Sequence, residues 1–81
     1  MDKRLREILR RLKKLRETIK FTQGIIAQQL RCDRTTYVRK ENGLIPITTE
    51  EWIKISEFLN VPVAYFFYDS KEAIEIKLKK F

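Results

Sequence analysis

Apolar residues recur at steps of three and four along the first segment of the chain, which is the spacing of one face of an α-helix. The segment reads DKRLREILRRLKKLRETI, and arginine and lysine fill most of its other positions. The apolar stripe consists of Leu5, Ile8, Leu9, Leu12 and Leu15. A basic amphipathic helix can also lie on a membrane, but this stripe has no Trp or Phe to anchor it there. We therefore expect a helix that packs on a core.

Two shorter helical patterns follow in TQGIIAQQLRCDRTTYVRKENG, residues 22–43. Thr22 and Asp33 are residue types that cap helix N-termini, and Gly43 is suited to end the second helix. The expected inward residues are Ile26, Ala27, Leu30 and Tyr37. Gly24 costs a helix roughly 1 kcal/mol relative to alanine, so packing must require or tolerate a small residue there. Two such helices joined by a short turn form a helix-turn-helix.

Beyond Gly43, LIPITTEEW reads as a loop that leads into a helix capped at Thr48 or Thr49. The broad apolar face of this helix consists of Trp52, Ile53, Ile55, Phe58 and Leu59. Asn60 is expected to end it, and Pro62 suits the first turn of a short fifth helix. The pattern thus predicts five helices over most of the chain.

The last segment, DSKEAIEIKLKKF, fits two different patterns. Ile74, Ile76 and Leu78 alternate with charged residues, as in a strand. Ile74, Leu78 and Phe81 also share one helical face, and strand and short helix both stay open. We accordingly divide the chain into a helix-turn-helix domain over residues 1–68 and a C-terminal tail over residues 69–81, which is a candidate dimerisation element.

Charge is distributed unevenly along the 81 residues, whose formal net charge is +7. Through Gly43 there are 13 Lys or Arg and 5 Asp or Glu, a net of +8, whereas the remainder has a net of −1. Hydrophobic residues make up 43% and charged residues 36%, which is the composition of one folded domain. The basic half predicts a surface for a polyanion, most often nucleic acid, with an anionic membrane as the competing ligand.

Several classes of chemistry are excluded by composition. The chain has no histidine, one cysteine and two glycines. It therefore lacks a Ser-His-Asp triad, an internal disulfide and a glycine-rich phosphate loop, and we expect no enzyme, no cofactor and no metal. No signal peptide is visible, and the longest apolar run, residues 61–68, is too short to span a bilayer. We expect a cytoplasmic protein without a membrane partner.

The segments TQGIIAQQLRCDRTTYVRKENG and PITTEEWIKISEFLNVP resemble the lambda-repressor/Cro-like helix-turn-helix family, the regulators of the xenobiotic-response-element type. The resemblance extends from about Leu5 to Phe67. It implies an all-α, compact five-helix fold in which the second and third helices form the DNA-binding unit. It also implies a bacterial, phage or mobile-element context.

The resemblance implies roles for individual residues. The helix from Arg34 to Asn42 would enter the major groove, where arginine can bind O6 and N7 of guanine and the threonine methyl group suits thymine. The base-contacting candidates are Arg34, Thr35, Thr36, Val38 and Arg39. The phosphate-contacting candidates are Thr22, Gln23, Lys40 and Asn42. Arg16 and Glu41 match a buried ion pair that ties the first helix to the third.

Four positions depart from the family pattern. Arg31 stands where the turn usually has glycine, which implies either a positive φ or an altered turn. Asp33 caps the third helix where Ser or Thr is commoner, and its charge would repel a phosphate. Leu44 and Ile45 stand where basic residues are common, which leaves apolar surface for a partner. The basic N-terminal helix is the candidate electrostatic compensation.

The expected function is a repressor-like regulator that binds double-stranded DNA as a homodimer on a near-palindromic operator, with half-sites about 10 bp apart. Three alternatives stay open beside it. The first is an antitoxin that represses its own operon and neutralises a toxin. The second is a protein-interaction module that has kept the fold without DNA readout, and the third is a membrane-surface binder. The dimer surface is expected either in the tail or around Leu44, Ile45 and the fifth helix.

Overall fold

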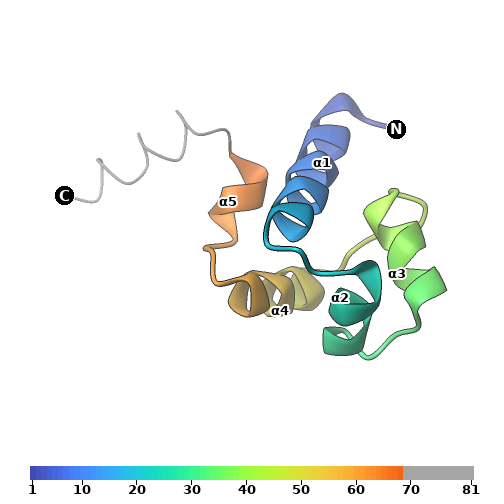
Figure 1. Ribbon diagram of the computed structural model, residues 1–81. Helices are drawn as coiled ribbons and strands as arrows, with labels where there is room; N and C mark the ends of the chain where they lie inside the picture. Colours follow the sequence, from blue (N-terminus) through green and yellow to red (C-terminus); the bar gives the residue numbers. More distant parts are fainter. Residues whose placement is uncertain (69–81) are drawn as a thin grey trace.

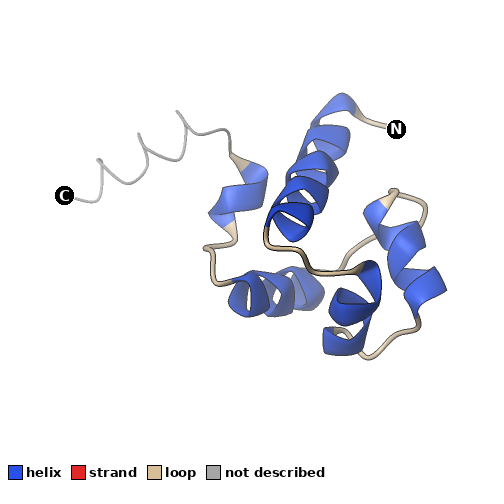
Figure 2. Ribbon diagram, in the orientation of Figure 1, coloured by secondary structure: helices blue, strands red, loops and turns tan. Residues whose placement is uncertain are grey.

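The computed structural model describes residues 1–68, and these form five helices without a strand (Figure 1, Figure 2). The helices are α1 (Lys3–Thr18), α2 (Gln23–Gln29), α3 (Arg34–Glu41), α4 (Thr49–Leu59) and α5 (Ala64–Phe67). Figure 1 shows α3 and α5 on opposite sides of α1, and both are in contact with it. The predicted all-α, five-helix fold is confirmed for this part of the chain. The strand-or-helix alternative for the tail lies outside the described residues.

All five helices contribute to one hydrophobic core. Its buried apolar residues are Ile8, Leu9, Leu12, Ile26, Ala27, Leu30, Tyr37, Trp52, Ile55, Leu59 and Phe66. Two residues assigned to apolar faces from the periodicity are exposed instead, Leu5 at 39% and Ile53 at 44%. Leu5 borders a shallow hollow beside Ile45 and Ile47, whereas Ile53 lies on the side of α4 away from the core. The two apolar faces are therefore narrower than predicted.

The first four helices begin at side-chain caps. Asp2, Thr22, Asp33 and Thr48 each accept a hydrogen bond from a backbone N–H in the first turn of the helix that follows. At α4 the cap is reciprocal, because the Glu51 carboxylate accepts the backbone N–H of Thr48 at 2.9 Å. The predicted starts at Thr22 and Asp33 are confirmed, and of the two alternatives at α4 the cap is Thr48. Such caps typically contribute ~1 kcal/mol each.

Each of the same four helices is followed, within two residues, by a residue with left-handed backbone geometry. These residues are Lys20 (φ 63°), Arg31 (φ 55°), Gly43 (φ 81°) and Asn60 (φ 58°). After α2, the N–H of Cys32 donates to the carbonyl of Ala27 and that of Arg31 to Gln28, both at 3.1 Å. This pair of bonds defines a Schellman motif. Arg31 therefore adopts the positive φ, so the turn between α2 and α3 keeps its usual geometry without a glycine.

Candidate nucleic-acid interface

One face of α3 is buried and the other is open to solvent. Tyr37 points into the core and is fully buried. On the opposite face Arg34, Thr35 and Arg39 are exposed, and Asn42 continues that face at the C-terminal cap. The other base-contacting candidates, Thr36 and Val38, are half-buried. The exposed face of α3 thus presents two guanidinium groups and a hydroxyl.

A buried ion pair connects α1 to α3. Arg16 donates to both carboxylate oxygens of Glu41, from Nε at 3.0 Å and from Nη2 at 2.9 Å. The two side chains are 8% and 1% exposed. A third guanidinium nitrogen, Nη1, donates to the carbonyl of Phe21 at 2.8 Å, in the segment between α1 and α2. The pair implied by the family resemblance is present, and it fixes the position of α3 relative to α1.

The same carboxylate also reaches α2. Nε2 of Gln23 donates to Oε1 of Glu41 at 3.3 Å, so one amide hydrogen of this phosphate-contacting candidate is used within the protein. The other phosphate-contacting candidate at this end, Thr22, is exposed, and its hydroxyl oxygen accepts the N–H of Ile25. The start of α2 is therefore fixed to both α1 and α3 through Glu41.

Burial and hydrogen bonding act in opposite directions on the Glu41 carboxyl group. Burial raises its pKa. The hydrogen bonds from Arg16, together with the neighbouring Tyr37 and Gln23, lower the pKa by a larger amount, so the net pKa lies below the ordinary value. The partner guanidinium has a raised pKa, chiefly because of its hydrogen bonds to Glu41. Both groups therefore stay charged at neutral pH. The Tyr37 hydroxyl is buried beside them, and its pKa is raised by that burial.

Lys40 lies in a different environment from the one we predicted. Its side chain is 10% exposed, and its Nζ lies 2.9 Å from Oε1 of Glu51 and 3.2 Å from the carbonyl oxygen of Pro46. The ammonium group is thus enclosed between α3 and the start of α4. Because at least two of its three N–H donors are used within the protein, we do not include Lys40 among the DNA contacts proposed below.

The start of α3 carries a negative charge as well. The Asp33 carboxylate accepts the backbone N–H of Thr36 at 2.6 Å, and this bond lowers the pKa of Asp33. The side chain of Arg39 lowers it slightly further by its positive charge. Asp33 is therefore ionised at neutral pH and lies near the exposed cations of α3. Cys32, next to it, is half-buried against the core, and burial raises the pKa of its thiol.

Sequence reasoning named the basic N-terminal helix as a whole, but it did not single out three of its cations that lie close to the end of α3. Arg6, Arg10 and Lys13 of α1 line a groove of about 240 Å³ together with Asn42. Their spacing of four and three residues was visible in the sequence, but their closeness to Asn42 depends on how α1 packs against α3.

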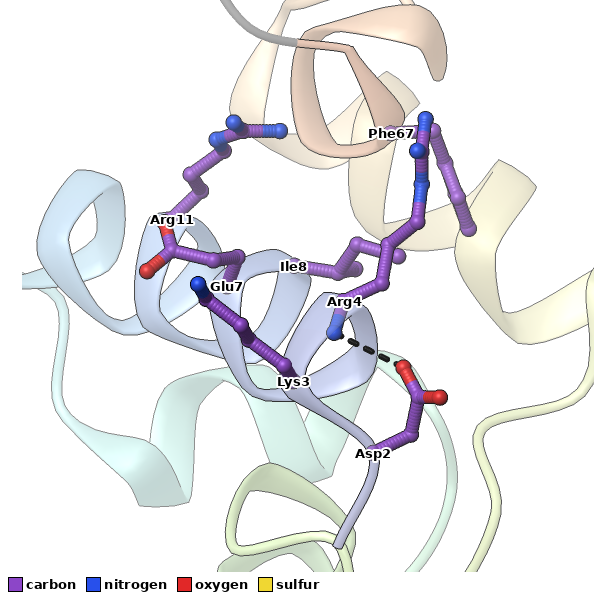
Figure 3. A pocket seen from close by; sticks show the side chains of 7 residues that line it. All are labelled: Asp2, Lys3, Arg4, Glu7, Ile8, Arg11 and Phe67. Atoms are coloured by element: carbon purple, nitrogen blue, oxygen red, sulfur yellow. Dashed lines mark hydrogen bonds between the residues drawn. The ribbon is translucent and has the colours of Figure 1, made fainter.

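A larger hollow, of about 410 Å³, lies between the start of α1 and α5 (Figure 3). Its charged side chains have both signs: they are Asp2, Lys3, Arg4, Glu7 and Arg11. It lies on the α5 side of α1, away from α3. No helix within residues 1–68 combines the length and the apolar character needed to cross a bilayer.

Comparison with known proteins gives one significant result. A family model described as helix-turn-helix matches residues 12–66, which is more than half of the chain and includes α2, the turn and α3. No curated protein and no solved structure matches the chain significantly.

Proposed function

The chain belongs to the lambda-repressor/Cro-like helix-turn-helix family of DNA-binding regulators, and on this premise we propose that it is a sequence-specific, repressor-like regulator. In this proposal α3 enters the major groove of duplex DNA. Arg34, Thr35 and Arg39 contact base edges, and the half-buried Thr36 and Val38 make contacts at the margin. Thr22, Gln23 and Asn42 contact phosphates on either side.

The observation that supports this proposal is the division of α3 into two faces. The buried face holds Tyr37 and the Glu41 carboxylate, which fix the helix to α1 and α2. The open face carries Arg34 and Arg39, whose guanidinium groups match the paired acceptors of guanine. A helix held firmly on one side and rich in exposed donors on the other is what reading a groove requires.

A homodimer is the expected binding form. The eight residues of α3 span only about 12 Å, so one copy can contact few base pairs. Two copies related by a twofold axis would read a near-palindromic operator with half-sites about 10 bp apart. The protein would act in the cytoplasm of a bacterium or in a phage or mobile-element context.

Selection of preferred sites from a random duplex library tests this proposal. The wild type should enrich a palindrome, and the Arg34→Ala, Arg39→Ala double variant should lose the enrichment while it keeps its fold. A matched control is Lys14→Ala with Lys54→Ala, which removes two exposed charges from other surfaces and should enrich the same palindrome. Absence of any enriched site with the wild type would reject the proposal.

A second candidate function is supported by one observation, the exposure of Leu44 at 74%. Beside it lies an apolar hollow lined by Leu5, Ile45, Ile47 and Trp52 among others. Such a surface suits a protein partner, as an antitoxin-type autoregulator or an interaction module without DNA readout would have. Co-expression with a small toxin encoded by a neighbouring gene tests this candidate function. If the wild type restores growth and the Leu44→Ser variant does not, the antitoxin function is supported. If the toxin stays equally toxic in the presence of the wild type, it is rejected.

A further inference from the structure

Three cations follow one another along the edge of α1 that is nearest to the end of α3. Arg6, Arg10 and Lys13, which we call the α1 row, are all exposed. Together with Asn42 they line the groove of about 240 Å³ between α1 and the C-terminal end of α3. At 1.5 Å per residue the row extends over about 10 Å, so it can reach more than one phosphate of a nucleic-acid strand.

Carboxylates leave most of this charge unneutralised. Glu41 lines the same groove, but its side chain is 1% exposed and both its oxygens accept hydrogen bonds from Arg16. Glu7 forms a pair with Arg10 at 3.0 Å, and both side chains are about half exposed, which makes the pair weak and easily exchanged. Within residues 1–68 no carboxylate forms an ion pair with Arg6 or Lys13.

The row is continuous with the open face of α3. Asn42 follows Arg39 by three residues, so the two lie on the same side of the helix. The loop after α3, residues 43–48, has no charged side chain. Cations for a DNA backbone at this end of α3 must therefore come from another part of the fold, and the α1 row lies directly beside it.

We propose that the α1 row binds the phosphate backbone of the same duplex, beyond the base pairs that α3 reads. This inference rests on the proposed function and adds a second contact region to it. The other surfaces of α1 differ in character. The hollow toward α5 mixes Asp2 and Glu7 with its cations (Figure 3), and Lys14 lies beside Tyr65 and Tyr68 rather than near α3.

The test compares two variants of equal charge on the operator selected with the wild type. Arg6→Gln with Lys13→Gln removes two charges of the row, and Lys14→Gln with Lys54→Gln removes two exposed charges elsewhere. The plot of log affinity against log salt concentration has a negative slope. The magnitude of this slope should decrease by about 1.8 in the row variant, about 0.9 for each lost phosphate contact. Its affinity at physiological salt should fall roughly 10- to 100-fold while its preferred sequence is unchanged. The control variant should keep its slope within about 0.5 of the wild type.

A conservative exchange, Arg6→Lys with Lys13→Arg, keeps both positive charges and should retain the wild-type slope. It shows whether the slope depends on the charges of the row or on the shape of its side chains. If the row variant keeps the slope of the control, the α1 row does not bind the backbone, whatever α3 does. If the wild type enriches no site, the proposed function fails and this inference fails with it. Circular dichroism should show all three variants to be folded, because the substituted side chains are exposed.

Discussion

The ammonium nitrogen of Lys40 lies 2.9 Å from Oε1 of Glu51, and that same oxygen accepts the backbone N–H of Thr48 at 2.9 Å. One carboxylate oxygen therefore connects α3 to the cap of α4. The lysine also donates to the carbonyl of Pro46 at 3.2 Å. As a result, the loop between the two helices is fixed at both ends by a largely buried ion pair.

Glu51→Gln should destabilise the protein by roughly 2 to 3 kcal/mol, because it leaves a buried ammonium group without a countercharge and weakens the α4 cap. Urea unfolding followed by circular dichroism measures the change. Glu50→Gln alters an exposed neighbour in the same helical turn and should cost less than about 0.5 kcal/mol.

The charge itself can be separated from the packing at this site. Adding Lys40→Met to Glu51→Gln removes the unpaired cation and should restore more than half of the lost stability, since replacing both partners is far less costly than removing one. A double variant as unstable as Glu51→Gln alone would show that the buried charge is not the cause.

Between pH 3 and 8, stability should depend on pH only within and below the ordinary range of carboxyl groups. Burial raises the pKa values of Glu41 and Glu51, but their hydrogen bonds and cationic partners lower them more, so both lie below the ordinary value of 4.5. A carboxyl group with a lowered folded-state pKa stabilises the fold above its unfolded pKa and loses this contribution as the pH falls toward the folded value.

The free energy of unfolding should therefore be nearly constant from about pH 5.5 to 7.5, where the chain has no histidine to titrate, and should decrease below about pH 4.5. Thermal melts across pH 3 to 8 measure this dependence. Glu41→Gln should be less stable at neutral pH and should show a shallower decrease in acid. An equally steep decrease in that variant would assign the effect to other carboxylates.

Arg31→Gly should stabilise the protein by roughly 0.5 to 1 kcal/mol. A left-handed residue with a Cβ is strained by about 1 to 2 kcal/mol, and glycine removes this strain. The greater conformational freedom that glycine gives the unfolded chain offsets only part of this stabilisation. Arg31→Ala is the matched control: it removes the same charge but retains the Cβ, so no gain is expected. Equal melting temperatures for the two variants would contradict this account of the turn.

The two glycines should respond to alanine in opposite directions. At Gly24 a Cβ would meet only ordinary contacts, Oγ1 of Thr22 at 3.7 Å and Cδ of Arg34 at 4.0 Å, so Gly24→Ala should stabilise α2 by about 0.5 kcal/mol. At Gly43, with φ of 81°, a Cβ would collide with the end of the Met1 side chain and approach Leu9 Cδ1 to 3.2 Å. Gly43→Ala should therefore cost about 1 to 2 kcal/mol, measured by the same urea titration.

The helices could be predicted from the sequence because their signals are local. Thr22 and Asp33 cap the helices that start one residue later, and Gly43 ends α3, as each residue type alone suggests. Leu5 is exposed and Leu9 is buried. This difference depends on where the neighbouring helices end, which the periodicity of the sequence does not reveal. The base-contacting set remains a prediction.

Lys40 shows why a side chain's partners could not be predicted in the same way. The family resemblance implied a phosphate contact, but the ammonium group of Lys40 meets Glu51, which lies eleven residues later in the chain, in α4. The α1 row could not be singled out within the basic N-terminal helix for the same reason, since the separation of Arg6 and Asn42 along the chain does not reveal that they line one groove.

The open face of α3 also has a consequence for how this protein can change over generations. Within residues 1–68 the side chains of Arg34 and Thr35 donate no hydrogen bond, whereas Tyr37 and Glu41 on the other face hold the helix in place. Under the proposed function, mutations that alter which bases are preferred can therefore accumulate with little effect on folding. The preferred DNA site could then drift while the scaffold beneath α3 is preserved.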